Sequence, residues 1–162
     1  MTTNLNGISV TNTESLYEED FNLWLRATAQ QLRDRQLDQL DFENLIEEIE
    51  SMGGSQRREI KNRLIILLMH LLKYQYQPDK RSSSWVGTIL EQHDQIEFIL
   101  VDSPSLKSYY LEIFSDCYNR AVRNASAETK LPVKHFPAAS PFLPENVLNS
   151  DFIYSLVSQE SD

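Results

Sequence analysis

The sequence predicts an all-α protein, a single-domain helical bundle of about five to six helices around a buried central helix. Only four glycines and six prolines occur in 162 residues, which leaves room for long helices. Apolar residues recur at steps of three and four, the period of an amphipathic helix. The segment from Leu64 to Leu72 is apolar at every position except His70. A helix that is apolar on nearly every side is enclosed by other helices, and this one is far too short to cross a bilayer.

The composition describes an acidic globular protein. With 41% apolar and 24% charged residues, the chain can bury an ordinary core. A net charge of −9 argues against a general nucleic-acid binder, which needs cations to replace phosphate counterions, and it favours basic partners. The single cysteine, Cys117, excludes an intrachain disulfide and metal sites built on paired cysteines. Residues 1–15 lack the features of a secretory signal, so we expect a cytoplasmic protein.

The first half of the chain predicts three helices. Residues 1–15 are polar and aperiodic, and we expect a flexible segment before a helical domain over residues 16–154. A first helix is expected from Leu16 to Arg35. Asp41 can cap a second helix from Phe42 to about Met52, with Phe42, Leu45, Ile46 and Ile49 as its buried side. Gly53-Gly54 should end that helix, and so short a connection to the next predicts an antiparallel helix hairpin.

The second half of the chain predicts the central helix and the helices that pack around it. The central helix should run from Ser55 to about Gln77, where Pro78 ends it. A fourth helix follows Ser82 to Ser84 and reaches Leu100, and a fifth runs from Pro104 to about Ala127. Residues 130–144 carry four prolines and predict a proline-rich loop. A last short helix should start at Pro144 and end at Leu148, and residues 155–162 should fray.

Charge is distributed by segment around the expected hairpin. Residues 38–50 contain six acidic residues and no Lys or Arg, whereas residues 55–81 contain seven basic residues against two acidic ones. One interpretation is that acids of the second helix pair with bases of the third and fix the register of the hairpin, although exposed pairs add little stability. The alternative is that some of these charges converge on a cleft and bind an ion or a charged partner.

One polar stripe along the central helix contains the best candidate for chemistry. At about 100° per residue, Glu59, Arg63, His70, Lys73 and Gln77 fall near one line. Polar groups on so apolar a helix need partners. A lone histidine amid leucines is commonly a core residue; if it is functional, a histidine beside carboxylates can move a proton or hold a metal. The catalytic candidates are therefore His70, Glu47, Glu48, Glu50 and Lys73. Neither Glu-x-x-His nor His-Glu-x-x-His is present, so we predict no metal site and no cofactor.

Residues 73–85 mix cations with aromatic side chains. Such mixtures can bind single-stranded nucleic acid through stacking and phosphate contacts. The simpler interpretation is a helix corner anchored by its aromatic residues, with the cations in solvent. The candidate binding residues are Arg57, Arg58, Arg63, Gln77, Arg81 and Trp85.

Three sequence blocks stand out when they are taken together. Asp20, Phe21 and Trp24 form a D-F/Y-x-x-W start, Leu45 to Gly53 form an L-x-E-E-I-E-x-M-G block, and Leu67 to Pro78 form an L-L-M-H-L-L-K-x-x-x-Q-P block. Together they resemble a bacterial family, abundant in cyanobacteria, that is catalogued as domain-of-unknown-function family 29. Ser84-Trp85, the DSPSL segment at 102–106 and Glu128 to Pro137 also fit, whereas Asp151, Phe152 and Tyr154 fit the family's aromatic end only loosely. The resemblance covers about residues 16–153. It implies an all-helical domain and no activity.

Three functional hypotheses follow from these observations. The preferred one is a small cytosolic protein-interaction or regulatory module, a binding protein rather than an enzyme, whose partner is another protein. The second is a hydrolase or nuclease-like enzyme that uses His70 with a carboxylate. The third is a nucleic-acid-binding module that uses the local basic residues. No membrane association is expected, and a homo-oligomer is left open.

Overall fold

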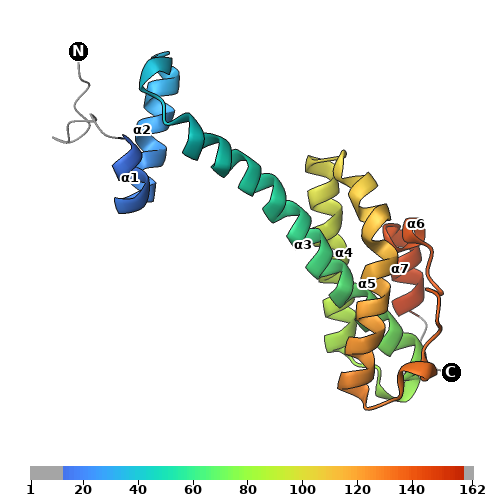
Figure 1. Cartoon of the computed structure of the whole chain (residues 1–162). Helices are drawn as coiled ribbons and strands as arrows, with labels where there is room; N and C mark the ends of the chain where they lie inside the picture. Colours follow the sequence, from blue (N-terminus) through green and yellow to red (C-terminus); the bar gives the residue numbers. More distant parts are fainter. Residues whose placement is uncertain (1–12, 159–162) are drawn as a thin grey trace. The chain divides into compact units, whose positions relative to one another are not determined.

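The computed structural model describes residues 13–158 of the chain and confirms the all-α prediction (Figure 1). Within that range there are seven α-helices and three short 3₁₀ turns, and no strand. The helices are α1 (Thr13–Glu19), α2 (Phe21–Arg33), α3 (Phe42–Tyr76), α4 (Ser83–Asp102), α5 (Leu106–Thr129), α6 (Pro144–Val147) and α7 (Ser150–Val157). Contacts divide the chain into two units with the boundary between Gly54 and Ser55, and α3 runs through that boundary.

The N-terminal unit contains α1, α2 and the start of α3. The expected helix from Leu16 to Arg35 is split at Asp20, whose carboxylate accepts a hydrogen bond from the amide of Leu23 and so caps α2. At the other end Arg35 adopts a left-handed conformation with φ of 57°. The amide of Arg35 bonds to the carbonyl of Leu32 and that of Gln36 to the carbonyl of Gln31. This is a Schellman arrangement, and it ends the helix at Arg33.

The predicted hairpin at Gly53-Gly54 is wrong, because both glycines are helical and α3 continues for 35 residues. A helix-ending glycine uses a left-handed backbone, which Gly53 does not adopt. Each glycine costs a helix interior about 1 kcal/mol relative to alanine. Good helix formers on both sides, Glu47 to Met52 and Gln56 to Lys61, continue the hydrogen-bond ladder through this weak point.

The C-terminal unit is built around the second half of α3, as expected for the central helix. Leu64, Leu67, Leu68, Leu71 and Leu72 are all fully buried, which confirms the predicted centre of the core. The α4 and α5 helices run beside this part of α3 (Figure 1), and buried residues from both join the same core cluster. Pro78 follows the end of α3, and Ser82 caps α4 by accepting from the amide of Trp85, as the sequence indicates.

The proline-rich segment after α5 closes one side of this core. Phe136, Phe142 and Val147 are buried there, and the hydroxyl groups of Tyr110 and Tyr118 donate to the carbonyl groups of Pro144 and Pro137. The α7 helix was not anticipated from the sequence. Asn149 caps it, and Ile153 anchors it in the core. Residues 155–157 belong to α7, while residues 1–12 and 159–162 of the expected terminal segments lie outside the described residues. None of the described helices has the length and apolar character required to span a membrane.

Candidate functional site

Lys73 is the most deeply buried of the predicted candidates. Its side chain comes from the last turns of α3 and is 8% exposed. The Nζ atom donates to Oε2 of Glu128 on α5 at 2.6 Å and lies 4.6 Å from the centre of the Trp85 ring on α4. Three helices therefore meet at one ammonium group, which the carboxylate and the aromatic face both stabilise. Sequence reasoning did not identify Glu128 as this partner, because the two residues are 55 positions apart in the chain.

His70 is half-buried rather than enclosed, and it has a backbone partner. Its Nδ1 atom lies 2.9 Å from the carbonyl oxygen of Ile66, one turn earlier. Because a carbonyl can only accept, Nδ1 carries the proton in this contact. Burial lowers the pKa of His70; the Ile66 carbonyl opposes that shift, the Lys73 ammonium adds to it, and Glu128 opposes it. The neutral ring is favoured, and the contact with Ile66 is a local structural bond within α3.

The three glutamates proposed to act with His70 belong to the other unit of the chain. Glu47, Glu48 and Glu50 are in the N-terminal unit and His70 is in the C-terminal unit, and α3 continues through the position of the predicted turn. Glu48 instead accepts a hydrogen bond of 2.6 Å from the hydroxyl of Tyr17 on α1. The predicted pairing of these acids with the arginines and lysine at 57–63 required the hairpin at Gly53-Gly54, which α3 does not form. Arg63 pairs with Glu59 on its own helix at 2.8 Å.

The structure distributes the candidate binding residues over several places in the C-terminal unit. Arg58 and Arg63 line one shallow pocket of about 480 Å³, where Arg63 also donates to Gln92 of α4. Arg81 lines another pocket, of about 280 Å³, and its Nε donates to the carbonyl of Tyr74. Trp85 contacts Lys73, the Arg57 guanidinium lies 5.8 Å from the ring centre of Tyr109, and Gln77 is half-buried beyond the end of α3. These six residues do not assemble into a single described pocket.

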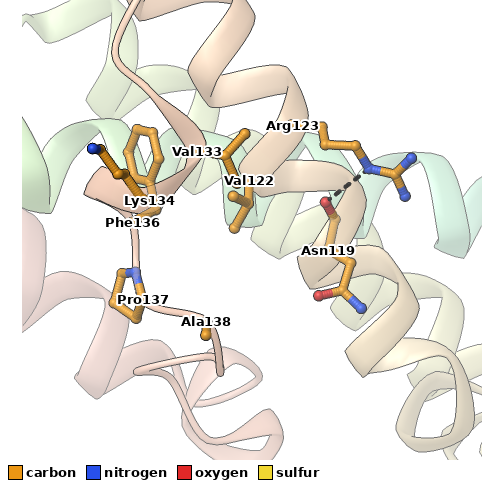
Figure 2. Close-up of a pocket in the computed structure, with 8 residues that line it drawn as sticks. All are labelled: Asn119, Val122, Arg123, Val133, Lys134, Phe136, Pro137 and Ala138. Carbon is orange, nitrogen blue, oxygen red and sulfur yellow. Dashed lines mark hydrogen bonds between the residues drawn. The ribbon is translucent and has the colours of Figure 1, made fainter.

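A further pocket, of about 340 Å³, lies between α5 and the segment that follows it (Figure 2). Its lining contains no carboxylate, histidine, cysteine or hydroxyl group, so it offers no pair for acid–base or nucleophilic chemistry. The polar side chains on it are those of Asn119, Arg123 and Lys134, and the Nε of Arg123 donates to the carbonyl of Asn119. The apolar part consists of Val122, Val133, Phe136, Pro137 and Ala138.

One cluster on α4 has side chains of the types that hold metal ions. His93, Asp94 and Glu97 offer ligand atoms within 4.8 Å of one another, and Nδ1 of His93 lies 3.2 Å from Oδ1 of Asp94. The Nε2 atom of His93 is buried with no described partner. A carboxylate oxygen accepts, so Nδ1 of His93 donates in the contact with Asp94, and Nε2 is then a buried acceptor with no described partner.

The N-terminal unit exposes an unusual amount of apolar surface. Fifteen large apolar side chains are exposed among the described residues, and eight of them fall between residues 21 and 52. The sequence predicts Phe42, Ile46 and Ile49 on a buried helix face, but they are 52%, 53% and 60% exposed. That prediction is wrong, and the antiparallel hairpin that would have covered this face is absent. The other five are Phe21, Leu25, Leu32, Leu37 and Met52.

The same unit holds nearly all of the net negative charge. Residues 13–54 contain eleven acidic and three basic residues, a balance of −8 out of −9 for the whole chain. Glu43, Glu47 and Glu50 on α3 are exposed beside the apolar residues. An acidic, apolar and solvent-facing helix is the feature that sequence reasoning missed, although the segmental charge was visible in the sequence.

Fold and surface together define an all-α protein with no assembled catalytic constellation among the described residues. The chain belongs to the family described as domain of unknown function DUF29, whose model matches residues 16–153. Searches for similar curated proteins and for similar solved structures each found no match.

Proposed function

We propose that this protein is a cytosolic protein-interaction module whose docking surface is the exposed apolar face of its N-terminal unit. The observation that carries the proposal is the exposure of Phe42, Ile46, Ile49 and Met52, each more than half exposed on successive turns of α3. Single exposed apolar residues are ordinary, but a concentration of them on one element marks a surface that another protein covers. Burying a side chain of this size stabilises a complex by roughly 1.5–3 kcal/mol.

Site-specific photo-crosslinking tests the proposal. A photoreactive residue replaces Ile49, and in a matched control it replaces Phe98 of α4, which is also 60% exposed but lies in the C-terminal unit. After irradiation in native extract, we expect a discrete adduct from position 49 alone. The crosslinked protein is then identified, purified and titrated against the full-length chain, and saturable binding is expected. Equal adducts from both positions, or no binding by the purified protein, would contradict the proposal.

A further inference from the structure

Two parallel rows of side chains run along the first part of α3. Phe42, Ile46 and Ile49 stand at steps of four and three residues, and they fall within about 60° of one another around the helix. Glu43, Glu47 and Glu50 repeat the same steps one residue later. At about 100° per residue the second row lies directly beside the first. The helix therefore presents an apolar row bordered on one side by a carboxylate row.

The carboxylate row is free to meet a partner. Glu43, Glu47 and Glu50 are exposed, and none of them forms a described ion pair or side-chain hydrogen bond. Glu48, by contrast, lies on the other side of the apolar row and is bonded to Tyr17. On one side of the apolar row, Glu48 is therefore bonded to α1. On the other side, the carboxylate row is exposed to solvent.

From this arrangement we infer that the docking element of the partner is a basic amphipathic helix, which lays its apolar face on the apolar row and its lysines or arginines on the carboxylate row. The inference rests on the proposed function and gives the partner its chemistry. Complementary charge beside an apolar stripe selects partners and sets their orientation. A balance of −8 in residues 13–54 opposes a second copy of the same face, and it opposes phosphate backbones and anionic membranes.

The test uses three synthetic peptides of about 18 residues, roughly five helical turns. One is an amphipathic helix of leucine and lysine, the second replaces lysine by glutamate, and the third scrambles the first. Titration into the full-length protein is followed by fluorescence anisotropy. We expect saturable binding of the ordered basic peptide, at least tenfold tighter than binding of the other two. Added salt should weaken it.

Two variants separate the two rows. Glu43→Gln/Glu47→Gln/Glu50→Gln keeps the shape of the carboxylate row, and it should weaken binding of the basic peptide about tenfold, the combined effect of three exposed pairs. Ile46→Ser/Ile49→Ser should abolish binding of every peptide. Circular dichroism and the unfolding midpoint confirm that both variants fold.

The outcomes distinguish the charge inference from the docking proposal. If the basic and acidic peptides bind equally well and the serine variant binds neither, the inference of a basic partner is wrong and the proposal of a docking surface stands. Equal binding of the scrambled peptide would show non-specific charge attraction and overturn the inference. Failure of every peptide to bind also counts against the inference, and a dimer that sedimentation detects in the wild type and not in the serine variant would assign the face to a second copy.

Discussion

Tyr17 on α1 donates a hydrogen bond of 2.6 Å to Oε1 of Glu48 on α3. The two residues are 31 positions apart in the chain, and their bond links α1 to α3. Tyr17 also contacts the Trp24 ring edge-to-face, with the ring centres 5.0 Å apart. This small aromatic and polar cluster organises the acidic N-terminal unit while its apolar row stays exposed.

The Tyr17–Glu48 bond predicts a shifted tyrosine titration. The bond to Glu48 is the main cause that raises the pKa of Tyr17 to about 12. The folded pKa lies above the unfolded one, so the associated stability is present below about pH 10 and is lost as the pH rises toward 12. The difference between wild-type and Tyr17→Phe absorbance titrations at alkaline pH should therefore have its midpoint near 12. In the Glu48→Gln background the same difference should move back toward 10; no movement would show that Glu48 is not the cause.

The core of the C-terminal unit predicts a large effect at Leu68. Leu68→Ala removes a fully buried side chain and should lower the free energy of unfolding by roughly 2–5 kcal/mol. Ile66→Ala is the matched control on the same helix, because Ile66 is 37% exposed, and it should cost less than about 1 kcal/mol. Reversible denaturant titration measures both. Equal losses would contradict the assignment of Leu68 to the centre of the core.

The Lys73–Glu128 pair predicts coupled mutational effects. Glu128→Gln leaves the mostly buried ammonium without its carboxylate, and it should cost about 1–2 kcal/mol, less than for a fully buried pair because the Glu128 side chain is 49% exposed. Lys73→Met removes that charge and keeps the apolar stem. In the Lys73→Met background, Glu128→Gln should cost much less. A double-mutant cycle with additive effects would rule out a stabilising interaction between the two residues.

The lowered pKa of His70 predicts a loss of stability in acid. Burial holds the pKa of His70 below 6.5 in the folded protein, so the unfolded chain takes up more protons as the pH falls. The His70 contribution is fully present above about pH 6.5 and is lost as the pH falls through the folded pKa. The stability difference between pH 7.5 and pH 5 should be smaller in His70→Gln than in the wild type. A larger difference would mean that His70 is stabilised in its charged form.

Sequence reasoning predicted the core better than the connections. The apolar run at 64–72 identified the buried leucines, because enclosure of an all-apolar helix follows from local composition alone. Gly53-Gly54 predicts a helix end, yet a glycine costs a helix only about 1 kcal/mol, and flanking residues decide whether the helix continues. Two further predictions depended on that hairpin. Without it, the expected meeting of Glu47, Glu48 and Glu50 with His70 loses its basis, and Phe42, Ile46 and Ile49 are exposed. The Glu128 partner of Lys73 depends on long-range packing that no local pattern contains.

The central claim is tested most directly by a binding measurement on two matched variants. The ligand is the purified partner identified by crosslinking from position 49, and its affinity for each variant is measured. Ile46→Ser/Ile49→Ser removes two exposed residues from the apolar row, and Phe98→Ser/Val101→Ser removes two residues from α4 that are at least as exposed. Calorimetric titration of the purified partner into each full-length protein should show at least a thirtyfold loss for the first variant and less than a threefold change for the second. Equal affinity of both variants for the partner would contradict docking on the N-terminal unit.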